Sequence, residues 1–139
     1  MIWVTWAGVK IDRIACAWLI RRFIDPEARL HFIVPHQALP AGEIPFDIPG
    51  VPFSHHQGCA SFRALCTGHD LDDGTLWRIA AIIDAADGAG DAALHPEAVG
   101  IDAVCTALGS AAGSDAEAVR IGAVLFDALY LALGGQAQR

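Results

Sequence analysis

Positively charged side chains are scarce in this sequence: 9 Lys and Arg residues stand against 16 Asp and Glu residues, which gives a formal net charge of −7. A protein that binds duplex nucleic acid needs clustered Lys and Arg side chains to contact the phosphates. The charge balance therefore argues against direct binding of nucleic acid.

The sequence also lacks a long uncharged apolar run. Its most apolar segment, residues 121–133, contains Asp127 and is too short to cross a bilayer. The first six residues have neither the basic start nor the apolar block and cleavage site of a signal peptide. We therefore expect no membrane span and a cytoplasmic location.

Cysteine occurs only four times, with no Cys-x-x-Cys pair and no zinc-finger spacing, at Cys16, Cys59, Cys66 and Cys105. Small disulfide-stabilised domains carry a denser cysteine framework, so free thiols are expected here. A thiolate near an arginine can donate electrons, which leaves open a thiol reductant that uses Cys16 or Cys59. For Cys66 and Cys105 we expect burial as inert side chains.

Apolar residues, in contrast, make up 54% of the 139 residues. A chain of this length forms one compact domain, here taken as residues 1–139, that buries roughly two thirds of its unfolded surface. The mean hydropathy of +0.41 and the Ala-rich segments favour a second copy that covers some apolar surface. A homodimer is therefore an expectation to test.

The chain begins with the pattern of a βαβ unit. Residues 2–6 are β-branched and aromatic and predict a strand, and residues 29–34 predict a second one. Between them, apolar residues recur at helical spacing over residues 11–24 until Asp25 and Pro26 end the helix. A parallel return to the first strand requires this helix as a crossover.

The rest of the chain predicts a loop followed by helices. Five prolines make residues 35–52 irregular, with at most a short extended piece at residues 46–48. Asp72 or Asp73 and Ser114 are expected N-caps, and Pro96 suits a first helical turn. Helical patterns cover residues 60–66, 75–86, 96–108 and 115–133. The predicted fold is mixed α+β: a small N-terminal βαβ-like sheet of two or three strands packed with four or five helices.

The first candidate site lies in the opening helix. Asp12 and Cys16 are one helical turn apart and face the same way, and Arg13 follows the strand-to-helix connection. Groups at the carboxyl end of a strand can meet a ligand. Alternatively, Asp12 caps the helix and Cys16 packs as a small apolar side chain.

The second candidate lies in the loop. His55 and His56 point to opposite sides of an extended segment, so one of them is expected to enter a given site. Histidine is the commonest ligand of transition metals, and Gly58 permits a close approach of the backbone. The alternative is a pair of solvated or hydrogen-bonded imidazoles.

The third candidate is a carboxylate pair, Asp84 and Asp87, at the end of the helix over residues 75–86. Two like charges at the negative end of a helix repel each other and the helix dipole. A metal ion, an arginine or full exposure to water would compensate this repulsion.

Three blocks of the sequence resemble the chromate-resistance (ChrB-type) domain family, in the family's order. They are residues 11–28, residues 44–51 and the His55-His56-x-Gly58-x-x-Ser61-Phe62 segment; the final helix is similar as well. Longer members place a regulatory half before this domain, and we expect this chain to begin at the domain. Residues at positions typical of the family are Asp12, Arg13, Cys16, Trp18, Arg21, Arg22, Phe46, Asp47, His55, His56 and Asp87.

The resemblance implies a bacterial domain linked to tolerance of chromate, a tetrahedral oxyanion. It implies a divalent metal site (Mn, Fe or Zn) at Asp12, His55, His56 and Asp87. Cys16, Cys59 and Asp84 are further candidate site residues. Any catalysis would be metal-assisted redox or hydrolytic chemistry. The alternative is a chromate or metal sensor, or a partner-binding domain, without turnover.

Two positions depart from the family pattern. Arg63 stands where relatives tend to carry an acidic residue, and Asp84 stands where a histidine is common. An arginine beside the site favours an anion. We therefore assign Arg13 and Arg63 to oxyanion binding, in which a guanidinium donates to two oxygens of the anion. The expected ligand is therefore a small oxyanion, a metal ion or both.

Overall fold

The computed structural model describes residues 1–88 and 93–137. Within these residues it contains a three-stranded parallel sheet in the order β2-β1-β3, formed by β1 (Ile2–Trp6), β2 (Arg29–Ile33) and β3 (Ile44–Pro45). Five α-helices accompany this sheet in the same residues. The mixed α+β prediction is thus confirmed.

The βαβ start is confirmed as well. The crossover from β1 to β2 consists of α1 (Ile11–Leu19) followed by one π-helical stretch, η1 (Ile20–Ile24). The backbone N–H of Asp25 donates to the carbonyl of Ile20, five residues earlier, before Pro26 follows. The predicted helix therefore has the right limits, but its last turn is wider than an α-helix.

The short extended piece predicted at residues 46–48 is wrong in position. β3 spans Ile44–Pro45, and the backbone N–H of Phe46 makes the last bond to β1, at the carbonyl of Val4. Asp47 then adopts a φ of 50°, in the left-handed region, which turns the chain away from the strand direction.

The helices after the loop are α2 (Ser61–Gly68), α3 (Gly74–Ala86), α4 (Glu97–Ala112) and α5 (Asp115–Ala132). Asp73 and Ser114 are the N-caps of α3 and α5, as predicted, and each accepts backbone N–H bonds. Helix α4 runs four residues past its predicted end at residue 108, because Gly109 is accommodated and the left-handed Gly113 is the C-cap. No helix among the described residues combines the length and apolar character needed to cross a membrane.

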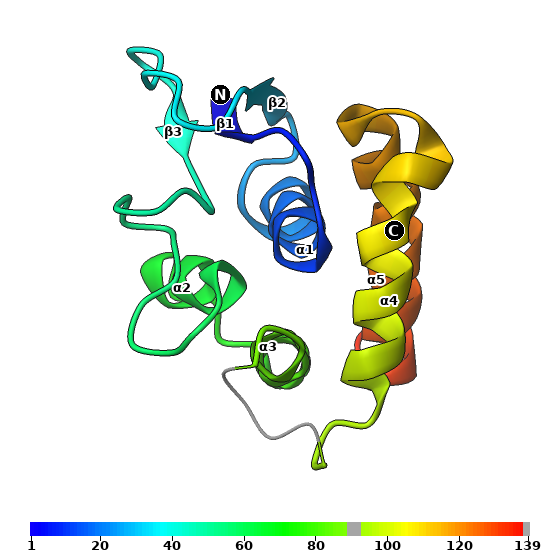
Figure 1. Ribbon diagram of the computed structural model, residues 1–139. Coiled ribbons are helices and arrows are strands. Elements are labelled where there is room, and N and C mark those ends of the chain that lie inside the picture. Colours follow the sequence, from blue (N-terminus) through cyan, green and yellow to red (C-terminus); the bar gives the residue numbers. More distant parts are fainter. Residues whose placement is uncertain (89–92, 138–139) are drawn as a thin grey trace.

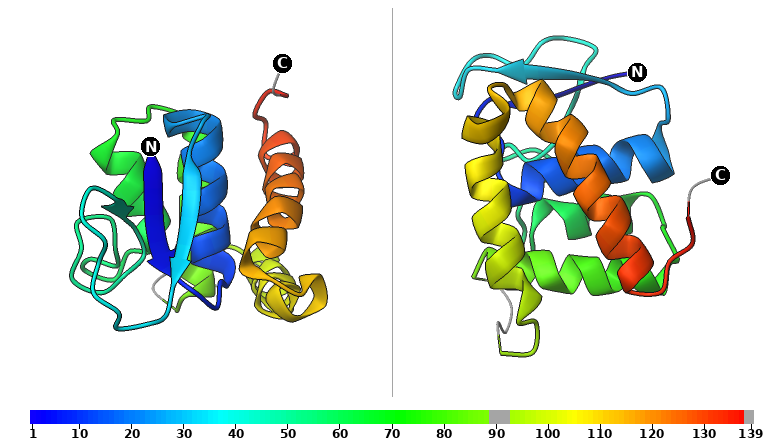
Figure 2. Two further views of the ribbon diagram at one scale, coloured as in Figure 1. Left: turned by 90° about the horizontal axis from the view of Figure 1, so that it is seen from above. Right: turned by 90° about the vertical axis from the view of Figure 1, so that its right-hand side faces the viewer.

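Helix α1 is the centre of the molecule. The sheet covers one side of it, α2 and α3 lie on a second side, and α4 and α5 pack on a third (Figures 1 and 2). Helix α5 comes close to α1 at Gly122, where a Cβ would lie 2.3 Å from a methyl group of Ile14. The core stacks Trp18 of α1 on Phe62 of α2, with ring centroids 6.3 Å apart.

The N-terminal end of α1 is where distant segments meet. The turn from β1 is held by Asp115 at the start of α5, whose carboxylate accepts the backbone N–H groups of Gly8 and Val9. The irregular segment after β3 passes the same end of α1 on its way to α2. These connections bring polar side chains from four parts of the chain to one place.

Candidate metal centre

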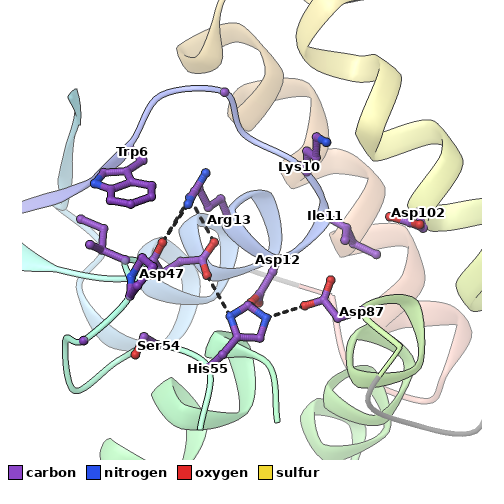
Figure 3. A pocket seen from close by; sticks show the side chains of 14 residues that line it. Trp6, Lys10, Ile11, Asp12, Arg13, Asp47, Ser54, His55, Asp87 and Asp102 are labelled. Atoms are coloured by element: carbon purple, nitrogen blue, oxygen red, sulfur yellow. Dashed lines mark hydrogen bonds and ion pairs between the residues drawn. The ribbon is translucent and has the colours of Figure 1, made fainter. Parts of the chain in front are cut away.

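A cavity of about 590 Å³ opens at this end of α1 (Figure 3). Its wall comes from the turn after β1, from α1, from the segment before α2, from the end of α3 and from α4. The ionisable side chains along it are Lys10, Asp12, Arg13, Asp47, His55, Asp87 and Asp102. Four of these side chains are carboxyl groups and only two are permanent cations, so the cavity favours a positively charged ligand.

Asp12 lies in the first turn of α1 but does not cap its own helix. Its Oδ2 accepts the backbone N–H of Ser61 at 2.8 Å, and its Oδ1 accepts that of Phe62 at 3.0 Å. The carboxylate therefore caps the N-terminus of α2, where the helix dipole favours negative charge. The Cys16 thiol donates to Oδ1 at 3.5 Å, so the predicted shared face of Asp12 and Cys16 is confirmed.

The imidazole of His55 lies between carboxylates on both of its edges. Its Nε2 is 2.8 Å from Oδ2 of Asp87 and 3.5 Å from Oδ2 of Asp12. Its Nδ1 is 3.5 Å from Oδ1 of Asp47. The ring is about half exposed, at 52%, so ligands can reach it from the cavity.

Asp12, His55 and Asp87 form a possible metal site. One ligand atom from each residue lies within 4.8 Å of the other two. Asp87 is the residue at which α3 ends, and its side chain therefore leaves the helix and points to the cavity (Figure 3). Three separate segments thus supply two carboxylates and one imidazole.

Asp47 is held in place beside the ring of His55. Its Oδ2 pairs with Nε of Arg13 at 3.1 Å, and its Oδ1 accepts the hydroxyl proton of Ser61 at 2.6 Å. Arg13 also donates to the backbone carbonyl of Asp47 and lies over the ring of Trp6, 5.7 Å from its centroid. The guanidinium of Arg13 is thereby largely committed to Asp47.

The crowding of acidic groups changes their protonation. Burial, together with the nearby charges of Asp47 and Asp87, raises the pKa of Asp12 to about 7. Burial also raises the pKa of Asp47, against the opposing effects of Ser61 and Arg13. Burial lowers the pKa of His55, but its bond to Asp87 and the surrounding carboxylates outweigh this and raise the pKa overall. A cation bound here would favour the ionised carboxylates of Asp12 and Asp47 and the neutral imidazole of His55.

Comparisons with known proteins identify the family to which the chain belongs. A family model described as "ChrB, C-terminal domain" matches residues 3–133. The chain belongs to the chromate-resistance (ChrB) family. Protein ChrB of Cupriavidus metallidurans is 38% identical over 103 residues, which cover 73% of this chain and 31% of that protein. The chain thus spans about a third of the length of this ChrB relative, and no solved structure matches it.

Of the metal ligands predicted for this ChrB-family domain, the structure brings three together and leaves one out. His56 is directed away from Asp12, His55 and Asp87, and its Nε2 lies 2.8 Å from the carbonyl of Pro52. His56 lines a second cavity, of about 490 Å³. The expectation that one of the two adjacent histidines enters the site fits this placement, and His55 is that residue.

Arg63 and Asp84, which the resemblance marked as departures from the family pattern, contact each other. Nε of Arg63 pairs with Oδ2 of Asp84 at 2.7 Å, and Oδ1 of Asp84 accepts the backbone N–H of Ala60. An arginine therefore compensates the charge of Asp84. Arg63 lines the second cavity and not the one that contains Arg13, so the structure does not place these two arginines around a common anion.

The two cysteines considered for thiol chemistry differ in their surroundings. Cys16 is fully buried, and burial together with the charge of Asp12 raises its pKa well above the ordinary value, which disfavours a thiolate. Cys59 is partly exposed and lines the second cavity with His56 and Arg63. Cys66 and Cys105 are buried, as expected.

Sequence reasoning did not assign Asp47, Ser61, Lys10 or Asp102 to the site. The resemblance marked Asp47 as typical of the family, but no sequence signal shows that a left-handed turn directs it to His55. Ser61 follows His55 by six residues in the family-like segment, and its contact depends on how α2 docks. Asp102 reaches the cavity only because α4 packs beside α1.

Proposed function

We propose that this domain binds a divalent metal ion through Asp12, His55 and Asp87. The observation that carries the proposal is the convergence of Oδ2 of Asp12, Nε2 of His55 and a carboxylate oxygen of Asp87 in one cavity. Imidazole nitrogen and carboxylate oxygen are ligands that manganese, iron and zinc accept. The residues come from α1, from the segment before α2 and from the end of α3, so the site depends on the complete fold.

The separations of these atoms fit a shared ion. Metal bonds of about 2.0–2.2 Å place neighbouring ligand atoms about 2.8–3.6 Å apart at octahedral to tetrahedral angles. The distances from Nε2 of His55 are 2.8 Å to Asp87 and 3.5 Å to Asp12, which both lie within that range. Small side-chain rotations therefore suffice to form the site.

The backbone prepares Asp12 for this role. Two N–H groups at the start of α2 and the thiol of Cys16 occupy three of roughly four lone-pair positions of the carboxylate. One position remains for an ion. Asp12 is only 5% exposed, and a buried carboxylate of this kind gains most from a cation beside it.

The same cavity has room for an oxyanion next to the metal. Three protein ligands leave coordination positions open, and a bound ion would act there as a Lewis acid toward water or an oxyanion. Lys10 lies on the cavity wall at the start of α1, with no ion pair to it among residues 1–88 and 93–137. We propose chromate or a similar tetrahedral oxyanion as the second ligand, in keeping with the chromate-resistance family.

Metal content tests the proposal. Protein purified without added metal, and protein equilibrated with Mn²⁺ or Zn²⁺ and desalted, are analysed for metal by mass spectrometry and titrated by calorimetry. We expect about one ion per chain, and loss of binding in the His55→Ala/Asp87→Ala double variant. His56→Ala is the matched control and keeps the ion. Negligible metal in both wild type and double variant would reject the proposal.

A sensor without turnover is a second candidate, favoured by one observation. His55 lies in the long segment between β3 and α2, so an ion bound to its ring would restrain that segment. Hydrogen exchange with and without Zn²⁺ tests this function. Protection confined to residues 46–61, together with the absence of any chromate conversion, supports a sensor, whereas unchanged exchange contradicts it.

A further inference from the structure

Asp47 lies in an irregular segment, yet its backbone and its side chain are both held in one conformation. The residue has a φ of 50°, which residues other than Gly, Asn and Asp seldom adopt, and it is only 8% exposed. Its backbone N–H donates to the carbonyl of Phe53 at 2.7 Å. Backbone strain of this kind persists where surrounding contacts enforce it, and it often lies beside functional groups.

Each carboxylate oxygen of Asp47 has its own donor. Arg13 holds Oδ2, and the hydroxyl of Ser61 holds Oδ1. Ser61 is completely buried, and Arg13 is restrained by Trp6 and by the backbone carbonyl of Asp47. The carboxylate therefore has a defined orientation before any ligand binds.

That orientation places Oδ1 of Asp47 at one edge of the His55 ring. Nδ1 of His55 lies 3.5 Å from this oxygen and 3.5 Å from the hydroxyl oxygen of Ser61. The opposite nitrogen, Nε2, faces Asp12 and Asp87 (Figure 3). A neutral imidazole that binds an ion through Nε2 carries its proton on Nδ1, and this proton needs an acceptor.

We propose that Asp47 is a positioning residue that accepts the Nδ1 proton of His55 and so turns Nε2 toward Asp12 and Asp87. The inference rests on the metal site proposed above and adds a residue outside its ligand set. Asp47 does not act as a fourth ligand, because it lies at the ring edge opposite the three converging atoms. Arg13 contributes by holding Asp47, which gives this arginine a role other than gripping an anion.

The test combines ring position with metal affinity. In metal-free protein, a nuclear Overhauser effect between the ring proton on Cε1 of His55 and the β-protons of Ser61 reports the ring position. We expect this signal in the wild type and its loss in Asp47→Ala. Asp47→Asn keeps an oxygen acceptor and tolerates the left-handed backbone, so it restores the signal. Asp102→Asn removes a charge from the cavity wall without contacting His55, and it leaves the signal unchanged.

Zn²⁺ titration of the same samples completes the test. Loss of an outer partner of a metal-bound histidine weakens metal affinity roughly 10- to 100-fold, and we expect a loss of this size in Asp47→Ala and a smaller one in Asp47→Asn. If Asp47→Ala does not fold, Ser61→Ala replaces it in the test. This variant removes the donor to Oδ1 of Asp47, and we expect it to weaken Zn²⁺ affinity by a smaller factor. If Asp47 had only a structural role, its replacement would lower the thermal stability of the protein and leave the ring signal intact.

The two proposals fail in different ways. Equal Zn²⁺ affinity of wild type and Asp47→Ala, or a ring signal that persists in Asp47→Ala, overturns the positioning role. If Zn²⁺ binds neither protein, the metal site is wrong, and the ring signal in metal-free protein still decides whether Asp47 positions His55.

Discussion

The carboxylate of Asp12 accepts the backbone N–H of Ser61 at 2.8 Å, across 49 positions of the chain. The same oxygen lies 3.5 Å from Nε2 of His55. One buried side chain therefore caps α2, joins it to α1 and takes part in the candidate metal site. Stability and ligand binding are coupled through Asp12.

Replacement of Asp12 by alanine leaves the N–H groups of Ser61 and Phe62 without their carboxylate. Buried donors without partners cost about 1–3 kcal/mol, so we expect a loss of that size in the free energy of unfolding at pH 6. Urea denaturation measures it. Asp72→Ala, at an exposed position, is the control and changes little. Equal stability of Asp12→Ala and wild type would show that the cap contributes nothing.

The raised pKa of Asp12 predicts a pH dependence. In the folded state this pKa is about 7, above the ordinary value of 3.8, so the folded protein holds the proton more tightly than the unfolded chain. The resulting stability is present at low pH and is lost as the pH rises toward and through 7.

Metal-free wild type should therefore lose on the order of 2 kcal/mol relative to Asp12→Asn between pH 5 and pH 8. Urea denaturation of both proteins in the presence of a chelator measures the difference, and saturating Zn²⁺ should remove it. Parallel stability curves for the two proteins would contradict the assignment of the raised pKa to Asp12.

Arg63 provides a test of the anion assignment made from the sequence. Because Arg63 is the cation beside the buried carboxylate of Asp84, outside the main cavity, Arg63→Ala should lower the free energy of unfolding by about 1–3 kcal/mol. Calorimetric titration should show unchanged binding of Zn²⁺ and chromate. Arg13→Ala is the matched comparison and should weaken Zn²⁺ binding, since it releases Asp47. Loss of chromate binding in Arg63→Ala would restore its predicted role.

The cysteines should differ in reactivity. Cys16, Cys66 and Cys105 are buried, and burial raises the pKa of Cys66 to about 12 and that of Cys105 to about 11. A disulfide reagent added to native protein should therefore modify one thiol per chain quickly. We expect Cys59→Ser to abolish this reaction and Cys16→Ser to preserve it, and the reverse pattern would revive Cys16 as a reductant.

The sequence predicted local structure well, because helical spacing and capping residues act over short distances. Asp12 and Cys16 share a face as their spacing requires, and Asp73 caps α3. Spacing did not show that Asp84 and Asp87 would have different partners. The helix ends at Ala86, so Asp84 meets Arg63 while Asp87 turns to His55.

Contacts between distant segments account for what the sequence left open. Whether His55 or His56 faces the cavity depends on the path of an irregular loop, and Asp47 reaches the ring through a left-handed turn without a glycine. The cap of α2 by Asp12 requires that two helices dock first. Such relationships follow from tertiary packing and carry no local pattern.

A crystal structure of protein soaked with Zn²⁺, with anomalous scattering data at the zinc edge, tests the central claim most directly. The account predicts one strong anomalous peak within bonding distance of Oδ2 of Asp12, Nε2 of His55 and a carboxylate oxygen of Asp87. A peak at His56 and Cys59 instead, or no peak in the cavity at the end of α1, would contradict it.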